Sequence, residues 1–423
     1  MNVNDSERMY SLLEMQNYTP VQSPEQADLI IINSCSVREK PVHKVHSEVG
    51  KYRKLKEANP KLKIGVGGCV GQQEKKNLLK DIPVLDFVFG PDNIDELPQI
   101  VGKASLERVS QAKFHHQEPY EIETLVRNPG VATFVNITKG CDNFCTFCVV
   151  PFTRGRLRSR PDEEIVTDVK KLVDRGVKEV TLLGQNVNSY MSEADINFSK
   201  LLVRICKETG IERIRYTTSH PKDFDQELVD VMAEYRPRIC DYIHLPVQHG
   251  NSEVLERMNR GYTREEYLAK AKMIFDALPG VSFSTDLIVG FPGETEDQFQ
   301  ETLSILDEVP YESIYAFKYS PRPFTKAARW EDQLSEEDKS RRLTQLIEKH
   351  REIAFNLVKR YDGQVWDILV EHEDRKIEGV VVGRTTTNKL VHFKGGKDLI
   401  GQTVPVKITR AAPQTLLGER VLT

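Results

Sequence analysis

Six strand-type runs, each separated from the next by a helix-length segment, fill the middle of the chain. They lie at residues 133–138, 179–183, 213–217, 242–245, 282–289 and 313–318. Repeated strand–helix units build a parallel sheet with helices on its outside, and enough of them curve into a full or partial barrel. The repeat therefore predicts a full or partial (βα) barrel over residues 131–358, with chemistry at the loops that follow the strands.

Residues 1–102 alternate in the same way and predict a second α/β domain. We expect helices over residues 6–16, after Ser36 and after Val70, with strands over residues 28–33 and 63–67. Such alternation is typical of a doubly wound parallel sheet with helices on both faces. Ser36 and Glu39 have the spacing of a capping box, which places the start of a helix here.

Two cysteines occupy equivalent places in this amino-terminal domain. Cys35 follows the first predicted strand and Cys69 follows the second, and each leads into a predicted helix. The loops at the carboxyl ends of strands are where open α/β sheets bind ligands. A core role is the alternative for either cysteine alone, but two thiols in matching loops favour a metal site.

The two remaining segments differ from the rest in composition. Residues 103–130 are polar, mixed in charge and without a clear period, so we expect a linker. Residues 359–423 contain five short strand-type runs, at 365–370, 378–383, 389–393, 404–409 and 416–422. Five short strands without helices predict a small antiparallel β-barrel, an architecture that oligonucleotide-binding modules use. A passive packing domain is the alternative.

Composition is that of a cytoplasmic enzyme. The 423 residues carry 39% hydrophobic side chains and seven cysteines. No apolar run is long enough to span a bilayer, and the amino terminus lacks a secretion signal. An odd cysteine count without such a signal favours reduced thiols. The net charge of −4 is unevenly distributed, since residues 38–63 form a basic run. A solvated helix face explains such a run more often than a binding surface does.

Three cysteines crowd into the loop after the first barrel strand, as Cys141-Asp-Asn-Phe-Cys145-Thr-Phe-Cys148. Thiolates at this density select iron–sulfur clusters or zinc. Structural zinc sites usually close four positions with two ligand pairs, and no second pair lies nearby. The spacing resembles the signature of the radical S-adenosylmethionine (SAM) superfamily, in which three cysteines hold a [4Fe–4S] cluster and one iron stays open to SAM. The alternative is a set of buried structural or regulatory thiols.

With these motifs in place, the chain resembles the methylthiotransferase family of radical SAM enzymes, and most closely its branch that modifies dimethylallyl-adenosine in tRNA. The matching stretches extend nearly from end to end: residues 33–40, 65–69, 86–93, 136–156, 182–190, 218–224, 244–250 and 285–295. The family has an amino-terminal methylthiotransferase domain, a radical SAM partial barrel and a carboxyl-terminal TRAM domain that binds RNA. These correspond to residues 1–102, 131–358 and 359–423.

The resemblance implies that a methylthio group replaces the C2 hydrogen of a modified adenine next to the tRNA anticodon. That hydrogen is neither acidic nor displaceable, so cofactors must carry the step. In the family Cys141, Cys145 and Cys148 hold the cluster that reduces SAM to a deoxyadenosyl radical, which makes them the expected catalytic residues. A second [4Fe–4S] cluster, held by three cysteines, supplies or carries the sulfur. One SAM methylates that sulfur and a second provides the radical.

Cys35 and Cys69 match two of the three ligands of this amino-terminal cluster. In relatives the third ligand lies on a strand and glycine–cysteine loop that precede the segment matching Met1-Asn-Val-Asn-Asp-Ser. The resemblance therefore implies that this chain lacks the third ligand and the first strand of the sheet. We expect two neighbouring strands to be left unpaired as a result, and we expect the true start of translation to lie upstream.

Six further positions lie at strand ends that face the expected SAM site: Gly184, Gln185, Ser219, Gln248, Ile288 and Gly290. Glycine there permits close backbone approach, although glycine at strand ends is also ordinary turn chemistry. Glu294 is a weaker candidate, because Thr295 and Gln298 form a capping box and Glu294 then merely precedes a helix.

The other polar and thiol candidates are less specific. Arginines at 154, 156, 158 and 160 suit phosphate or the SAM carboxylate, or they form one solvent face of an extended segment. Cys206 and Cys240 are expected to be core thiols. The expected partners are tRNA and an electron donor such as flavodoxin or ferredoxin, with no membrane, and we expect a monomer.

Two rival functions stay open at the level of sequence. One is methylthiolation of a different target, either threonylcarbamoyl-adenosine in tRNA or an aspartate of a ribosomal protein. The other is an RNA-binding iron–sulfur protein without catalysis. Substrate choice depends on the shape of the pocket, which the sequence does not show.

Overall fold

A computed structural model describes residues 2–36, 39–115, 120, 124 and 129–421 of the chain. They form two compact units. The first contains Met1–Asn128, Thr138–Arg158 and Ser320–Arg329, and the second contains Pro129–Ile137, Ser159–Tyr319 and Trp330–Thr423. The loop with the three clustered cysteines therefore packs with the amino-terminal residues, although the sequence places it in the barrel domain.

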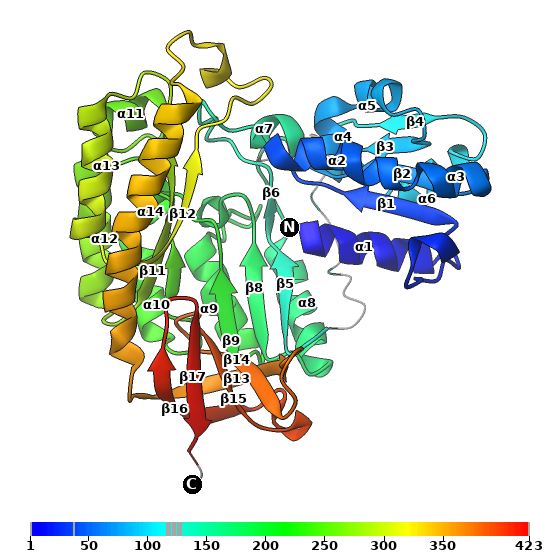
Figure 1. The fold of residues 1–423 in the computed structure, drawn as a ribbon. Helices are drawn as coiled ribbons and strands as arrows, with labels where there is room; N and C mark the ends of the chain where they lie inside the picture. The colour runs from blue at the N-terminus through cyan, green and yellow to red at the C-terminus, as the bar shows by residue number, and fades with distance from the viewer. Residues whose placement is uncertain (1, 37–38, 116–119, 121–123, 125–128, 422–423) are drawn as a thin grey trace. The chain divides into compact units, whose positions relative to one another are not determined.

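The first unit is built on a four-stranded parallel sheet in the order β1-β2-β3-β4 (Figure 1). Its elements are α1 (Asn2–Glu14), β1 (Leu29–Asn33), α2 (Glu39–Lys51), α3 (Arg53–Ala58), β2 (Lys63–Gly67), α4 (Cys69–Glu74), α5 (Lys76–Asp81), β3 (Phe87–Phe89), α6 (Leu97–Lys103) and β4 (Val109–Gln111). Ile30 and Ile32 pack on one face of the sheet, and Leu29 and Ile31 pack on the other. Because successive side chains alternate between faces, helices cover both, as predicted for a doubly wound sheet.

Two predictions for this unit are wrong. The first placed a linker at residues 103–130, yet β4 lies within it and pairs with β3, with Val109 opposite Phe87. A segment of three residues is too short to show the alternation of apolar and polar side chains that marks a strand. Its pairing with β3 therefore determines that it forms a strand. The second expected two unpaired neighbouring strands, but β1 pairs with β2 along its full length. The capping box predicted at Ser36 includes residues 37 and 38, which lie outside the described residues.

The second unit contains the predicted partial barrel. Its parallel strands are β5 (Ala132–Asn136), β8 (Glu179–Leu183), β9 (Arg213–Tyr216), β10 (Tyr242–His244), β11 (Ser282–Val289) and β12 (Tyr311–Lys318). They form two sheets, β5-β8-β9 and β10-β11-β12, joined by a parallel bridge between Ile214 and Ile239. The helices outside them are α8 (Asp162–Asp174), α9 (Phe198–Glu208), α10 (Gln226–Glu234), α11 (Ser252–Arg257), α12 (Arg264–Ala277), α13 (Glu296–Glu308) and α14 (Glu336–Val358). The predicted barrel of parallel strands with helices on its outside is confirmed in its partial form.

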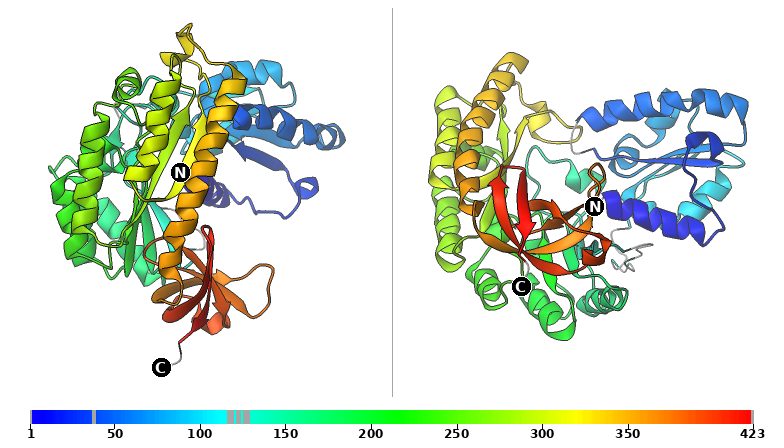
Figure 2. Two further views of the ribbon diagram at one scale, coloured as in Figure 1. Left: turned by 60° about the vertical axis from the view of Figure 1, so that its left-hand side comes forward. Right: turned by 60° about the horizontal axis from the view of Figure 1, so that its bottom comes forward.

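A small closed barrel completes the second unit (Figure 2). Its strands are β13 (Val365–Glu373), β14 (Val380–Arg384), β15 (Leu390–Lys394), β16 (Thr403–Ala411) and β17 (Thr415–Arg420), in the order β13-β14-β15-β17-β16. The prediction of an antiparallel barrel is wrong at one pair, because β15 and β17 run parallel where the barrel closes. Val370, Val381, Val391 and Ile408 fill its interior.

The small barrel is held to the partial barrel by buried polar contacts at the amino-terminal ends of the strands. Arg213 at the start of β9 donates to the carbonyl oxygens of Arg384 and Asp367 at 2.7 and 3.0 Å. Arg215 donates to Thr385 O at 2.6 Å. Chemistry is expected at the opposite, carboxyl-terminal ends of these strands, so the small barrel packs away from them.

Within residues 2–36, 39–115 and 129–421, no helix has the length and apolar character needed to cross a bilayer.

Candidate active site

The three clustered cysteines lie on an irregular loop between β6 (Thr138–Lys139) and β7 (Arg158–Ser159), followed by the short helix α7 (Val150–Thr153). Cys145 is buried, and Cys141 and Cys148 are half-buried. The backbone N–H of Cys148 donates to Cys145 O at 2.9 Å, which bends the loop. A Cβ on Gly140, whose φ is +79°, would lie 2.0 Å from Arg156 O. Only glycine fits where the two ends of the loop approach so closely.

The donor set of this loop fits an iron–sulfur cluster better than a single zinc ion. Across the described part of the chain, no three His, Cys, Asp or Glu side chains gather closely enough to hold one ion. A [4Fe–4S] cluster is wider than an ion, because each thiolate binds a different iron. Three soft thiols within one short loop match that requirement.

Cys35 and Cys69 meet at the carboxyl edge of the amino-terminal sheet, as predicted. Cys35 follows β1, Cys69 opens α4 after β2, and the two strands are parallel neighbours. A hydrogen bond from the Cys35 thiol lowers the pKa of Cys69 to about 6, against burial and with help from the Arg154 charge. The two sulfurs are therefore in contact beside a buried cation. Thiolate character suits a metal ligand.

The four alternating arginines each engage a carboxylate. The pairs are Arg154 with Asp5 at 2.7 Å, Arg156 with Asp142 at 2.6 Å, Arg158 with Asp92 at 2.6 Å and Arg160 with Asp168 at 2.8 Å. Arg154 and Arg160 are buried, so the alternative of one solvent face is wrong. These contacts make the arginines part of the framework around the cysteine loop and the first barrel helix.

The six other predicted residues lie in the second unit, at the carboxyl edge of its strands. Gly184 and Gln185 follow β8, Ser219 follows β9 and Gln248 follows β10. Ile288 lies near the end of β11, and Gly290 follows that strand. The backbone turns sharply here, because Thr218, Gln248 and Gly290 have φ values of +69°, +74° and +71°. Left-handed backbone at non-glycine residues costs free energy and is concentrated at functional sites. The edge therefore has the features of a ligand site.

Sequence reasoning missed two polar residues at this edge. Asn186 joins adjacent loops, because its Nδ2 donates to Asp223 Oδ2 at 2.6 Å and its Oδ1 accepts from the His220 backbone N–H at 3.1 Å. Burial, together with the nearby charges of Arg260 and Lys222, lowers the pKa of His220 to about 2. His220 Nε2 and Ser219 Oγ are buried without a hydrogen-bond partner among the described residues. A histidine in the loop that follows a strand was the available signal.

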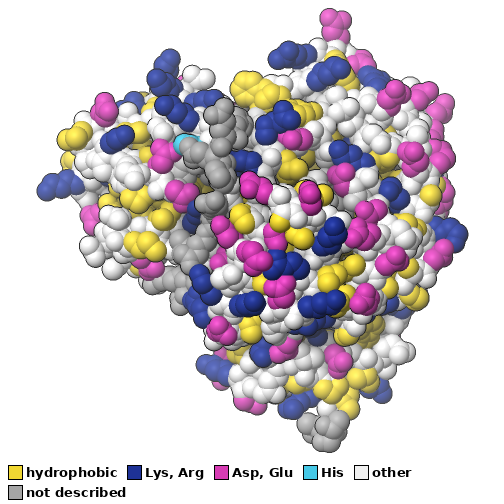
Figure 3. All heavy atoms as spheres, turned by 180° about the vertical axis from the view of Figure 1, so that it is seen from behind, with side chains coloured by type: hydrophobic (Ala, Val, Ile, Leu, Met, Phe, Trp, Pro, Cys, Tyr) yellow, Lys and Arg dark blue, Asp and Glu magenta, His cyan; other side chains and the backbone are white. Residues whose placement is uncertain are grey.

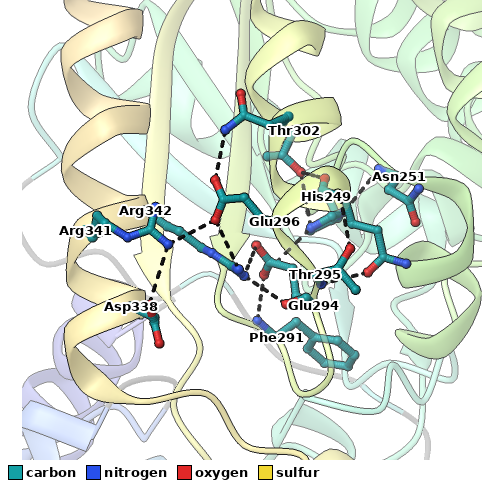
Figure 4. A network of polar contacts seen from close by, with 12 residues as sticks. His249, Asn251, Phe291, Glu294, Thr295, Glu296, Thr302, Asp338, Arg341 and Arg342 are labelled. Atoms are coloured by element: carbon teal, nitrogen blue, oxygen red, sulfur yellow. Dashed lines mark hydrogen bonds and ion pairs between the residues drawn. The ribbon is translucent and has the colours of Figure 1, made fainter.

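Glu294 belongs to a buried network that shapes the loop after β11 (Figure 4). Its Oε2 accepts from the Phe291 backbone N–H at 2.9 Å, and its Oε1 lies 3.0 Å from Arg342 of α14. Thr295 and Gln298 form the predicted capping box of α13. Glu294 thus precedes helix α13, as the capping box predicted. Its carboxylate contacts Phe291 and Arg342 of the protein itself.

Cys206 and Cys240 are core thiols, as predicted. Both are buried in the second unit. Burial raises the pKa of Cys206 to about 11 and that of Cys240 to about 12. Protonated thiols in apolar surroundings are poor metal ligands.

Comparison with known proteins assigns all three segments. Residues 135–306 match the radical SAM superfamily, residues 359–421 match the TRAM domain, and residues 1–90 match the uncharacterized protein family UPF0004. Among solved structures, the radical SAM methyltransferase TsrM from Kitasatospora setae has a TM-score of 0.51 at 15% identity, over 76% of this chain and 68% of its own. That similarity supports the fold alone.

Two relatives match nearly from end to end. The tRNA-2-methylthio-N(6)-dimethylallyladenosine synthase of Bdellovibrio bacteriovorus is 64% identical over all of this chain and 93% of its own length. The synthase of the same name from Carboxydothermus hydrogenoformans is 48% identical over 97% of this chain and 94% of its own. With this similarity and the cysteine loop in place, the chain belongs to the tRNA-2-methylthio-N(6)-dimethylallyladenosine synthase family of radical SAM enzymes.

Proposed function

We propose that this protein is a radical SAM methylthiotransferase that replaces the C2 hydrogen of dimethylallyl-adenosine, next to the anticodon of tRNA, with a methylthio group. The observation that carries the proposal is 64% identity over the full chain to a synthase of that name. The identity extends over the amino-terminal segment with Cys35 and Cys69, the cysteine loop, the barrel and the TRAM domain, which are the parts that the proposed reaction uses.

Cys141, Cys145 and Cys148 hold a [4Fe–4S] cluster that also binds SAM. When bound, these cofactors supply the radical chemistry that removes a hydrogen which acid–base groups cannot remove. The chain itself binds and orients. Gly184, Gln185, Ser219, Gln248, Ile288 and Gly290 line the SAM site through backbone and side-chain groups. The left-handed backbone at Gln248 supports this assignment, because such backbone in a non-glycine residue is concentrated at functional sites.

A second cluster bound by Cys35 and Cys69 is the sulfur-handling site in this proposal. The contact between the two thiols and the lowered pKa of Cys69 support it. The family uses three cysteines here, and the other two cysteines of this chain, Cys206 and Cys240, are buried core thiols. The iron content of the full chain, compared with that of a Cys35→Ala variant, tests whether this second cluster forms.

The substrate and the electron donor follow from the same chemistry. We expect the TRAM barrel to bind tRNA, the enzyme to act as a monomer in the cytoplasm where tRNA is found, and a flavodoxin- or ferredoxin-type protein to deliver electrons. Basic and acidic side chains are interspersed on the face shown in Figure 3, so this face presents no continuous basic patch. Binding that rests on phosphate contacts weakens steeply as salt is added.

An in vitro assay tests the proposal. The cluster-loaded chain is mixed with reductant, SAM and tRNA that carries dimethylallyl-adenosine, and the digested nucleosides are analysed by mass spectrometry. The proposal requires SAM cleavage and a methylthiolated nucleoside. SAM cleavage without methylthiolation of this tRNA would favour one of the other targets. Absence of both would favour a non-catalytic iron–sulfur protein.

A further inference from the structure

We infer that Asp92 and Asp5, two carboxylates of the amino-terminal segment, hold the loop that carries Cys141, Cys145 and Cys148 in its cluster-binding shape. They act as positioning residues, and the inference rests on the proposed role of the three cysteines. In the sequence these carboxylates lie far from the loop. In the structure they belong to the same compact unit.

Asp92 contacts both strands at the base of the loop. Its side chain is only 2% exposed and forms ion pairs with Lys139 of β6 and with Arg158 of β7, the latter at 2.6 Å. Burial raises the pKa of Asp92, but the charges of Lys139 and Arg158 outweigh burial and hold that pKa below its usual value. Lys139 Nζ also donates to Pro91 O at 3.0 Å. One carboxylate therefore joins the two strands two residues before Cys141.

Asp5 holds the far side of the same loop. It lies in α1 and accepts from Arg154 Nη2 at 2.7 Å, while Asn2 Oδ1 accepts from the same nitrogen at 3.2 Å. Arg154 follows α7 and is buried, six residues after Cys148. The cysteine loop is thus fixed at its base by Asp92 and beyond its last cysteine by Asp5.

The physical consequence comes from charge balance. Removing one partner of a buried ion pair leaves the other charge desolvated and unpaired, which is far less favourable than removing both. Without the Asp92 charge, Lys139 and Arg158 become two adjacent buried cations that repel each other. The strands β6 and β7 then separate, and the spacing of the thiols at the end of β6 changes with them.

The test uses the full chain with Cys35→Ala and Cys69→Ala, so that only the three-cysteine cluster contributes to the signal. Asp92→Asn, Asp5→Asn and the control Asp95→Asn are reconstituted in parallel. Asp95 lies three residues from Asp92 and also pairs with an arginine, Arg8, but its side chain is 56% exposed. The measurements are iron content, the EPR spectrum of the reduced cluster, and the change of that spectrum as SAM is titrated.

We expect Asp92→Asn and Asp5→Asn to weaken cluster or SAM binding by about 10-fold or more, the usual effect of losing a group that supports metal ligands. Asp95→Asn should match the parent protein. Adding Lys139→Met to Asp92→Asn removes one unpaired charge and should restore part of the signal, which a purely structural defect would not show. If Asp92→Asn alone does not fold, the double variant is compared with the parent protein in its place.

Two negative results are distinguishable. Parent-like spectra and SAM titrations in both Asp92→Asn and Asp5→Asn would overturn the positioning role while leaving the cysteine assignment intact. A parent protein whose EPR signal does not respond to SAM would instead refute the proposed role of the three cysteines, and the inference with it.

Discussion

Glu312→Gln should strongly destabilise the contact between the TRAM barrel and the partial barrel. The Glu312 side chain, at the start of β12, is 4% exposed and lies 2.8 Å from Lys389 Nζ of the TRAM barrel. It also pairs with Arg360 and accepts from the Tyr361 hydroxyl at 3.2 Å. The substitution keeps the shape of the side chain and removes only its charge.

The size of the effect follows from the burial of each partner. Breaking a buried ion pair by neutralising one partner costs about 3–5 kcal/mol. The Lys389 side chain is 7% exposed, so its unpaired charge keeps nearly the whole free-energy cost of desolvation. The Arg360 side chain is 34% exposed, so water can solvate its charge after the pair is lost. Discounting Arg360 for solvent screening, we expect a loss of about 3 kcal/mol in the free energy of unfolding.

Urea unfolding followed by tryptophan fluorescence measures this loss. Both tryptophans of the chain, Trp330 and Trp366, lie in the second unit, and Trp366 packs against Tyr361 with ring centroids 5.0 Å apart. Urea slopes rise with protein size, and a slope of about 3 kcal/mol/M or more converts the loss into a midpoint lowered by up to roughly 1 M.

Two comparisons decide whether the explanation is right. Asp307→Asn removes an exposed partner of Lys349 in the same unit and should change the free energy of unfolding by less than ~1 kcal/mol. Glu312→Gln with Lys389→Met should recover part of the loss, because the unpaired charge is gone. A Glu312→Gln protein that unfolds like the Asp307→Asn control would refute the role of this buried charge.

Two further predictions concern the active site. Cys141→Ala, Cys145→Ala and Cys148→Ala should each abolish SAM cleavage and lower the iron content, whereas Cys206→Ala should cleave SAM normally; unchanged iron in all three would count against the assignment. Glu294→Gln should raise the KM for SAM by roughly 10- to 100-fold, because the loop at Gly290 loses its buried anchor and small misplacements are costly. Glu212, an exposed partner of Lys178 elsewhere in the same unit, provides the control, and equal KM values in Glu294→Gln and Glu212→Gln would contradict the anchoring role of Glu294 in the network of Figure 4.

Periodicity predicted the long elements well. The strand over residues 282–289 was predicted with the bounds of β11, and that over 179–183 with the bounds of β8, because both have neighbours on each side and read as buried runs. The short strand β4 was missed, because its three residues carry no pattern and its place depends on pairing with β3. The parallel pair β15 and β17 was missed for a related reason, since barrel closure brings together strands that are not consecutive.

The sequence predicted those features of the candidate site that depend on the spacing of residues along the chain. It did not predict those that depend on contacts between residues far apart in the chain. Three cysteines in one loop indicated a cluster from the sequence alone. The partners of the arginines were not visible, because Arg154 reaches Asp5 and Arg158 reaches Asp92 across long separations in the chain. The same limit hid the contact between Cys35 and Cys69, although their matching loops indicated that they lie at one sheet edge.

The most direct test is the nucleoside content of tRNA from a strain of the source organism that lacks this gene, measured by mass spectrometry. We predict that the methylthio group disappears from dimethylallyl-adenosine, that the unmodified precursor accumulates, and that the intact gene restores the product while a Cys145→Ala gene does not. Unchanged methylthiolation of that nucleoside in the deletion strain, or its restoration by Cys145→Ala, would contradict the proposed function.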